Sequence, residues 1–242
     1  MTDAHANLPA VEAALVAIDA LGYDEIVHTG DAIGLGPFPA ETLHRLLEVP
    51  RIRFLMGNHD AWFVNDLSSY PPSWMSDGEL AHQRWVHDQL TPDLKRAVAD
   101  WPYSITEDLS GTRVVFTHYA QPDRRGGFAP IVNEPSPADL DRLFGEAGAD
   151  VIFYGHHHPK SDMTGRSRYV NPGSLGCHDK PVARFAVLDV EVDGTYQLGF
   201  DHAAYEPGEL MRTLEQRQVP DRAFIRRVFF RFGDLRCDPT SR

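Results

Sequence analysis

The chain has 242 residues, 42% of them hydrophobic and 24% charged, which suits one globular domain with a sizeable core. Acidic residues outnumber basic ones by 35 to 23, and the net charge of −12 argues against binding along a nucleic-acid polymer, which requires a basic surface. No apolar run approaches the roughly 20 residues of a membrane span, no signal peptide is visible, and two cysteines make a disulfide framework unlikely, so we expect a cytoplasmic protein with no membrane partner.

The first hundred residues alternate helical and extended patterns. Asn7 can cap a helix whose apolar residues recur at helical spacing as far as Leu21, with Gly22 as its end. The following elements are a strand at 25–29, a helix at about 40–47, a strand at 53–56 and, after a polar turn at 57–60, a helical insert at about 62–104. The order predicts an α/β layered fold.

The second half turns gradually to strands. Apolar runs at 113–118 and 151–158 end in histidine, with a helix at 137–148 between them, and strands with a hairpin at Asp193-Gly194 follow. Residues 206–232 read as a C-terminal helical segment broken at Pro220. We therefore expect a single domain over 1–242.

Polar residues gather where these strands end, which is where α/β sheets bind their ligands. In extended segments residues two apart point to the same side, so Asp3 should converge with His5, and His156 with His158. The candidate metal ligands are Asp3, His5, Asp31, Asn58, His118, His156 and His158. Carboxylate, amide and imidazole ligands suit manganese, iron or zinc, and seven of them exceed one tetrahedral site. They match two ions about 3.5–4 Å apart that share Asp31.

Two residues of the Gly57-Asn58-His59-Asp60 turn are left over from this ligand set. His59 is a spare imidazole that can protonate a departing alkoxide, and Asp60 can fix its tautomer. Each motif alone has an ordinary explanation, such as a turn at Gly30-Asp31, an interior histidine at His118 or a surface metal scavenger at 156–158. All five motifs occurring in order make that explanation improbable.

The series D-x-H, G-D, G-N-H-D, H and G-H-x-H resembles the calcineurin-like metallophosphoesterases, especially their small bacterial and archaeal phosphodiesterase branch. The stretches 5–15, 30–39 and 170–176 are similar to that branch too, and the resemblance spans about residues 3–200. It implies an α/β fold arranged as a four-layer α-β-β-α sandwich, in which helices flank two mixed sheets.

The resemblance also implies roles for single residues. One metal would be held by Asp3, His5, Asp31 and His158, and the other by Asp31, Asn58, His118 and His156, with His59 as the catalytic acid. Manganese or iron are the favoured ions, with zinc or nickel as alternatives. The implied activity is hydrolysis of small, anionic phosphodiesters or phosphomonoesters, nucleotides among them, by in-line attack of a hydroxide that bridges the metals.

The sequence departs from the family pattern at its start. Only Met1 and Thr2 precede Asp3, so we expect the usual first strand to be missing. Our hypothesis is that the natural product begins upstream. Because chain ends fray, we expect Asp3 and His5 to be the least firmly held ligands. The stretch from Cys177 to Lys180 also departs from the pattern, so the family's substrate preference cannot be carried over.

Substrate contacts are open to two interpretations. The four tryptophans of the insert would ordinarily form its own small core. Alternatively Trp74, in a loop, stacks on a nucleobase together with Tyr119, a contact worth about 1–3 kcal/mol per base. Arg124 and Arg125 either grip a second phosphate or are solvated surface charges. The alternative function is a metal-dependent binding or regulatory protein that retains the site without turnover. The sequence makes no prediction of oligomeric state.

Overall fold

The computed structural model describes residues 1–121 and 127–232. Its helices are α1 (Leu8–Leu21), α2 (Pro39–Leu47), α3 (Asn58–Val64), α4 (Asp77–Gln89), α5 (Pro92–Ala99), α6 (Pro137–Phe144), α7 (Gly208–Gln216) and α8 (Arg222–Val228), with 3₁₀ turns η1 (Leu67–Ser69) and η2 (Gly145–Ala147). Its strands are β1 (Ile26–His28), β2 (Ile52–Phe54), β3 (Ser104–Leu109), β4 (Thr112–Thr117), β5 (Val151–Phe153), β6 (Ser161–Thr164), β7 (Arg168–Asn171), β8 (Val182–Val190) and β9 (Tyr196–Ala204). In the described ranges, no helix combines the length and apolar character needed to cross a membrane.

Helix α1 forms as its sequence predicts. The Asn7 side chain accepts a hydrogen bond from the Ala10 N–H at 3.2 Å, which satisfies one free donor of the first turn. Gly22 follows the last turn at a φ of 75°, a conformation that glycine adopts without strain. The buried face of α1 packs against β8 and β9.

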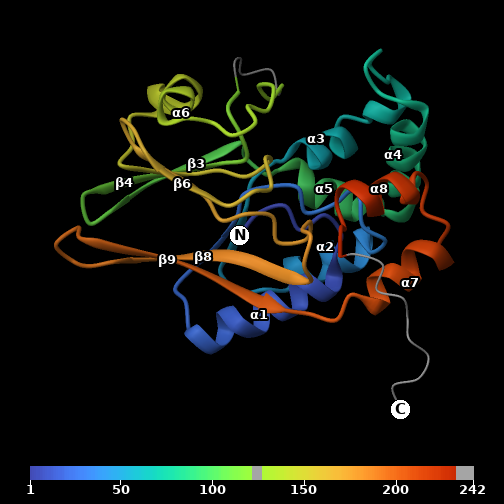
Figure 1. Cartoon of the computed structure of the whole chain (residues 1–242), viewed down its shortest axis with the longest axis horizontal. Coiled ribbons are helices and arrows are strands. Elements are labelled where there is room, and N and C mark those ends of the chain that lie inside the picture. The colour runs from blue at the N-terminus through green and yellow to red at the C-terminus, as the bar shows by residue number, and fades with distance from the viewer. Residues whose placement is uncertain (122–126, 233–242) are drawn as a thin grey trace.

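The main sheet has the order β3-β4-β5-β7-β6 and is mixed, with β4, β5 and β7 parallel and the two outer strands antiparallel to their neighbours. Both of its faces are buried. Ile152 and Tyr169 pack with α6 on one face, and Val151 and Val170 pack with residues of β8 and β9 on the other. Burial on both faces explains the continuous apolar run of β5. Figure 1 shows α6, this sheet, the β8–β9 hairpin and α1 as successive layers.

The second sheet is divided into two halves. β1 and β2 form a parallel pair, and β8 and β9 form an antiparallel hairpin that turns at Gly194. Residues 1–3 lie between the halves: the Thr29 N–H donates to Met1 O at 3.0 Å, and the Leu175 N–H donates to Thr2 O at 2.9 Å. The expected α/β class and layering are therefore confirmed, and the second sheet is interrupted where the first strand was expected to be missing.

The chain start is nevertheless well held. Asp3 and His5 are 0% and 1% exposed, and the Asp3 N–H donates to Gly30 O at 3.0 Å. The expectation that these two residues are loosely held is wrong, because loops on both sides bind their backbone.

The segment after β2 also differs from expectation. Gly57 precedes the first residue of α3, so Asn58, His59 and Asp60 form a helix start rather than a simple turn. Two of the tryptophans pack on the main core instead of forming a core of their own, and Trp101 stacks on Phe54 with ring centroids 4.5 Å apart. The two helices expected in the tail are α7 and α8, on either side of Pro220.

Candidate metal centre

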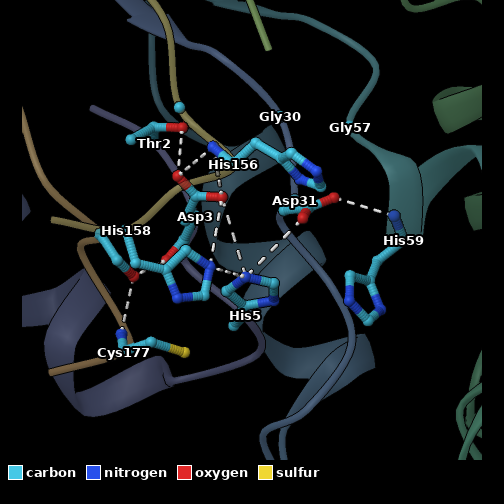
Figure 2. A network of polar contacts seen from close by, with 12 residues as sticks. Thr2, Asp3, His5, Gly30, Asp31, Gly57, His59, His156, His158 and Cys177 are labelled. Atoms are coloured by element: carbon cyan, nitrogen blue, oxygen red, sulfur yellow. Dashed lines mark hydrogen bonds and ion pairs between the residues drawn. The ribbon is translucent and has the colours of Figure 1, made fainter. Parts of the chain in front are cut away.

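All seven predicted ligands lie in one place, on the chain start, on the loops that follow β1, β4 and β5 and at the first residue of α3. Figure 2 shows five of them, Asp3, His5, Asp31, His156 and His158. Their backbone is not extended as predicted. Five of them have a left-handed φ between 47° and 67°: Asp3, His5, Asp31, His156 and His158. Such values are uncommon for residues other than glycine and concentrate at functional sites. Tight turns, not strand periodicity, bring these side chains together.

The first group of donor atoms surrounds His5. Its Nε2 lies 3.0 Å from His158 Nε2, 3.8 Å from Asp3 Oδ1 and 3.7 Å from Asp31 Oδ2. His158 Nε2 is 3.7 Å from Asp3 Oδ1. The other Asp3 oxygen accepts a hydrogen bond from the Thr2 hydroxyl, and both oxygens share the His156 N–H at 3.1 and 3.2 Å. Asp3 therefore directs Oδ1 at the two imidazoles.

The second group surrounds the side-chain oxygen of Asn58. That atom lies 3.2 Å from His118 Nε2, 2.8 Å from His156 Nδ1 and 3.1 Å from Asp31 Oδ2. The His118 Nδ1–H donates to Thr29 O at 2.9 Å, so Nε2 faces the group and offers it a lone pair once this nitrogen is deprotonated. His118 Nε2 is also 3.3 Å from Asp31 Oδ2.

Asp31 joins the two groups through one oxygen. Its Oδ1 accepts the His59 N–H at 2.9 Å, and its Oδ2 faces His5 and His118 at 3.7 and 3.3 Å. The shared oxygen is the arrangement that a carboxylate bridging two cations requires.

The donor atoms are spaced as the ligands of a metal ion are, although some of them repel one another when no ion lies between them. Ligand bonds of about 2.1 Å place adjacent ligand atoms about 3.0–3.4 Å apart in octahedral or tetrahedral geometry, close to the spacings found in both groups. An amide oxygen beside a carboxylate oxygen is repulsive unless the Asn58 amide is reversed or a cation lies between them. Burial opposes a charged His118, but Asp31 and Asp3 outweigh it and raise the pKa of His118 to about 9, as expected where positive charge is favoured.

Asp60 has a different role from the one predicted. Its carboxylate accepts backbone N–H bonds from Asp31 at 2.7 Å, Gly57 at 3.0 Å, Ala32 at 3.1 Å and Ile33 at 3.4 Å. It therefore ties the loop after β1 to the start of α3 and does not orient His59. A Cβ on Gly57 would lie 2.2 Å from Asp31, so only glycine allows these two loops to approach so closely.

The residue that contacts His59 is Gln83 of α4, which sequence reasoning missed. Gln83 Nε2 donates to His59 Nδ1 at 3.3 Å, which leaves the imidazole proton on Nε2. The ring also packs edge-on against His5 with centroids 5.1 Å apart. Burial lowers the pKa of His59, opposed by Asp31, and a lowered pKa makes its protonated form a stronger acid. Nothing in the spacing of Gln83 marks it as a site residue.

The residues predicted to contact the substrate differ in where the structure places them. Trp74 is 61% exposed and lies 5.7 Å from Trp62, whose ring is 4.6 Å from that of His59. Tyr119 is 2% exposed, behind His156, so its face is not available for stacking on a substrate. Arg124 and Arg125 lie outside the described residues.

Cys177 is a second residue that the prediction missed as a site residue. Its sulfur lies within 4.8 Å of donor atoms of His5 and His158. Burial raises the pKa of this thiol well above its usual value, so in the metal-free site it is protonated. Its place directly after the 170–176 stretch was the available signal.

Comparisons with known proteins assign the chain to a family. A family model for the calcineurin-like phosphoesterase superfamily domain matches residues 1–193. An uncharacterized protein of Methanocaldococcus jannaschii is 27% identical over 192 residues, which cover 73% of this chain and 74% of the relative.

Two solved structures share the fold over nearly the whole chain. A hypothetical protein from Pyrococcus horikoshii has a TM-score of 0.79 at 16% identity and covers 95% of this chain and 96% of its own. A metallophosphoesterase from Sphaerobacter thermophilus has a TM-score of 0.69 at 20% identity, covering 94% and 95%. With a family model that spans most of its length, the chain belongs to the calcineurin-like phosphoesterase superfamily.

Proposed function

We propose that this protein is a two-metal phosphoesterase that hydrolyses small phosphodiesters or phosphomonoesters. The observation that carries the proposal is the single Asp31 oxygen that faces two groups of buried donor atoms. One ion would be held by Asp3, His5, Asp31 and His158, and the other by Asp31, Asn58, His118 and His156. Such ions, manganese or iron in our proposal, supply positive charge to the phosphoryl oxygens and lower the pKa of a water molecule for attack.

The protein's own contribution to the chemistry is His59. A phosphoester leaves as an alkoxide, which is a poor leaving group unless it receives a proton. Gln83 holds His59 by its Nδ1, and Asp31 holds its backbone N–H, so ring and helix start are both fixed beside the donor groups. As an imidazolium, with the Gln83 amide reversed so that its oxygen accepts the Nδ1–H, His59 would donate its Nε2 proton to the departing oxygen and return to the neutral form.

The substrate class is suggested by aromatic rings. Trp62 and Trp74 extend in a row from the His59 ring to the solvent. We propose that this row stacks on the aromatic base of a nucleotide ester. Base stacking is sequence-tolerant and contributes about 1–3 kcal/mol per base.

The test of the activity is hydrolysis of bis(p-nitrophenyl) phosphate, p-nitrophenyl phosphate and a diester with an alkoxide leaving group, with and without manganese. We expect manganese-dependent turnover, and a loss of about 100-fold or more in His59→Ala for diesters with an alkoxide leaving group. Metal content of both proteins is the control, because His59 is not a proposed ligand. If the wild type binds two metals and turns over neither ester class, the retained site belongs to a binding or regulatory protein instead.

The test of the substrate class is Trp74→Ala. We expect a decrease of about 5- to 100-fold in kcat/KM for nucleotide esters, which corresponds to the stacking energy, and no decrease for esters without an aromatic group. Equal decreases for both ester types, or no decrease for either, would refute stacking. Tyr70→Ala is a matched control, since this nearby ring is also exposed and has no contact with Trp62 or Trp74.

A further inference from the structure

A continuous row of aromatic rings crosses the proposed metal centre. Its middle member is His5, whose ring contacts that of His59 on one side and that of His158 on the other, with centroids 5.1 and 4.9 Å apart. Figure 2 shows His59 and His158 on opposite sides of His5. Beyond His59 the row continues through Trp62 to Trp74, with successive centroids 4.6 and 5.7 Å apart. Trp62 and Trp74 form the tryptophan arm of the row, and its outer ring is mostly exposed.

The row has a second arm on the side of His158. The Phe229 ring meets that of His158 edge-on with centroids 5.8 Å apart, and Phe224 follows at 6.2 Å from Phe229. Phe224 and Phe229 form the phenylalanine arm, which belongs to α8 and its C-cap, outside residues 1–193 that the family model matches. The His158 side chain is 21% exposed and Phe224 is 42% exposed, so the site meets solvent on this side too. The proposed metal centre therefore lies between two exposed aromatic ends.

The phenylalanine arm is anchored to the rest of the protein. Ile225 and Phe230 are buried and pack in the main core. The Arg231 N–H donates to His178 O at 3.1 Å, which attaches the end of the segment to the loop after β7. Phe224 thus faces outward from a helix whose other side is fixed. An exposed apolar ring on a fixed element beside a polar site is typical of a ligand contact.

We propose that the two arms bind the two ester groups of a phosphodiester that carries a nucleobase on each side, with the phosphoryl group at the metal centre between them. The proposal rests on the proposed function and narrows its substrate to dinucleoside phosphates. A phosphodiester has two organic groups, one for each arm, whereas a phosphomonoester would leave one arm unused. Since the proton donor His59 belongs to the tryptophan side of the row, the departing group binds there and the retained group binds at the phenylalanine arm.

Arg227 gives the phenylalanine arm a preference for nucleobases over other aromatic groups. Its guanidinium lies over the Phe224 ring, 5.6 Å from the centroid, and makes no ion pair within the described part of the chain. The two other arginines of α8, Arg222 and Arg226, both pair with Glu215. Nucleobases stack on guanidinium planes as they do on rings, and their oxygen and nitrogen acceptors take hydrogen bonds from a guanidinium. Phe224 and Arg227 therefore match the flat face and the acceptor edge of a base.

The experiment compares two diesters that differ in their number of bases, a dinucleoside monophosphate and a nucleoside methyl phosphate. The kcat/KM of each is measured with manganese for the wild type, Phe224→Ala and Phe224→Leu. We expect both substitutions to lower the value for the dinucleoside monophosphate by about 5-fold or more, which corresponds to one stacking contact, and to leave the nucleoside methyl phosphate unchanged. Leucine retains the apolar bulk but has no flat face, so its loss separates stacking from helix stability. Arg226→Ala, which removes an exposed ion pair with Glu215 on the same helix, is the matched control and should change neither ester.

Binding is measured separately with a phosphonate analogue of the dinucleoside monophosphate, in which a methylene group replaces the ester oxygen that would depart. We expect Phe224→Ala to raise the calorimetric Kd of this analogue, in the presence of manganese, by about 5-fold or more. If the wild type hydrolyses diesters but Phe224→Ala changes neither kcat/KM nor this Kd, or lowers kcat/KM equally for both diesters, the phenylalanine arm does not bind a base and the proposed activity is unaffected. If the analogue binds through Phe224 but no ester is hydrolysed, the proposed activity fails and the role of the arm in binding stands.

Discussion

The loops after β1, β2 and β5 and the helical region after α3 both contribute to the site, but they hold their side chains by different means. In the loops, left-handed backbone and buried hydrogen bonds fix each donor atom: Asp60 alone accepts four backbone N–H groups. In the helical region, Gln83 makes one contact to His59, and Trp74 is mostly exposed. The comparison indicates that the geometry of the proposed metal ligands tolerates little change, whereas the proposed substrate contacts can vary.

Asp31→Asn is the substitution with the largest expected effect, and it tests the loop residues proposed to bind metal. The amide keeps an acceptor for the His59 N–H but loses the negative charge that both ions would share. We expect metal content to fall from two ions per chain toward one or none, and activity to fall by about 10³-fold or more, since each ion supplies several kcal/mol of transition-state stabilisation. Metal analysis by mass spectrometry and turnover are the measurements. Asp162→Asn, which alters an ion pair with Arg168 remote from the site, is the matched control. Two ions retained at full occupancy would contradict a shared carboxylate.

Asp60→Ala tests whether the loops depend on buried hydrogen bonds. The substitution leaves four buried N–H groups without an acceptor. We expect the free energy of unfolding to fall by about 3 kcal/mol or more, because each unsatisfied buried group costs about 1–3 kcal/mol. Urea unfolding in the presence of a chelator separates this loss from lost metal binding. Asp93→Ala, at an exposed helix start, should change stability by less than about 1 kcal/mol. Similar losses for both variants would refute the role given to Asp60.

A third prediction concerns protons at His118. Its pKa of about 9 means that the metal-free site holds a proton on this imidazole at neutral pH. Since a metal needs the Nε2 lone pair, binding should release that proton, and apparent affinity should rise about tenfold per pH unit below the pKa and level off above it. Calorimetry at pH 7.5 in two buffers of different ionisation enthalpy measures the release. Identical heats in both buffers would exclude it.

The site residues that belong to local motifs could be predicted from the sequence, whereas contacts between distant segments could not. The proposed ligands could be predicted because few chemistries need Asp-x-His, Gly-Asp and Gly-Asn-His-Asp in this order, and helix α1 could be predicted from its cap and spacing. The assumption of extended geometry at Asp3 and His156 failed because tertiary hydrogen bonds impose left-handed turns that no local propensity favours.

Contacts between distant segments were beyond the sequence. Asp60 follows His59 directly, yet its partners are the backbone of residues 31–33, and backbone donors leave no sequence signal. Gln83 reaches His59 from a helix twenty-four positions further along the chain. The buried position of Tyr119 depends on how α6 packs over the sheet, which periodicity alone does not determine.

Gln83→Leu has the smallest expected effect on activity, and it tests the contact that the helical region makes with His59. Leucine keeps the approximate volume but cannot hydrogen-bond to His59 Nδ1 in either protonation state, so the imidazole loses part of its orientation. A neutral hydrogen bond is worth about 1 kcal/mol, which predicts a decrease of about 5-fold in kcat for esters with an alkoxide leaving group. Esters of p-nitrophenol should be affected less, because nitrophenolate departs without a proton, and KM and metal content should not change. Arg84→Ala, at the exposed neighbouring position of α4, provides the control. Equal losses for both leaving groups, or a rise in KM alone, would show that Gln83 acts on substrate binding and not on the proton donor.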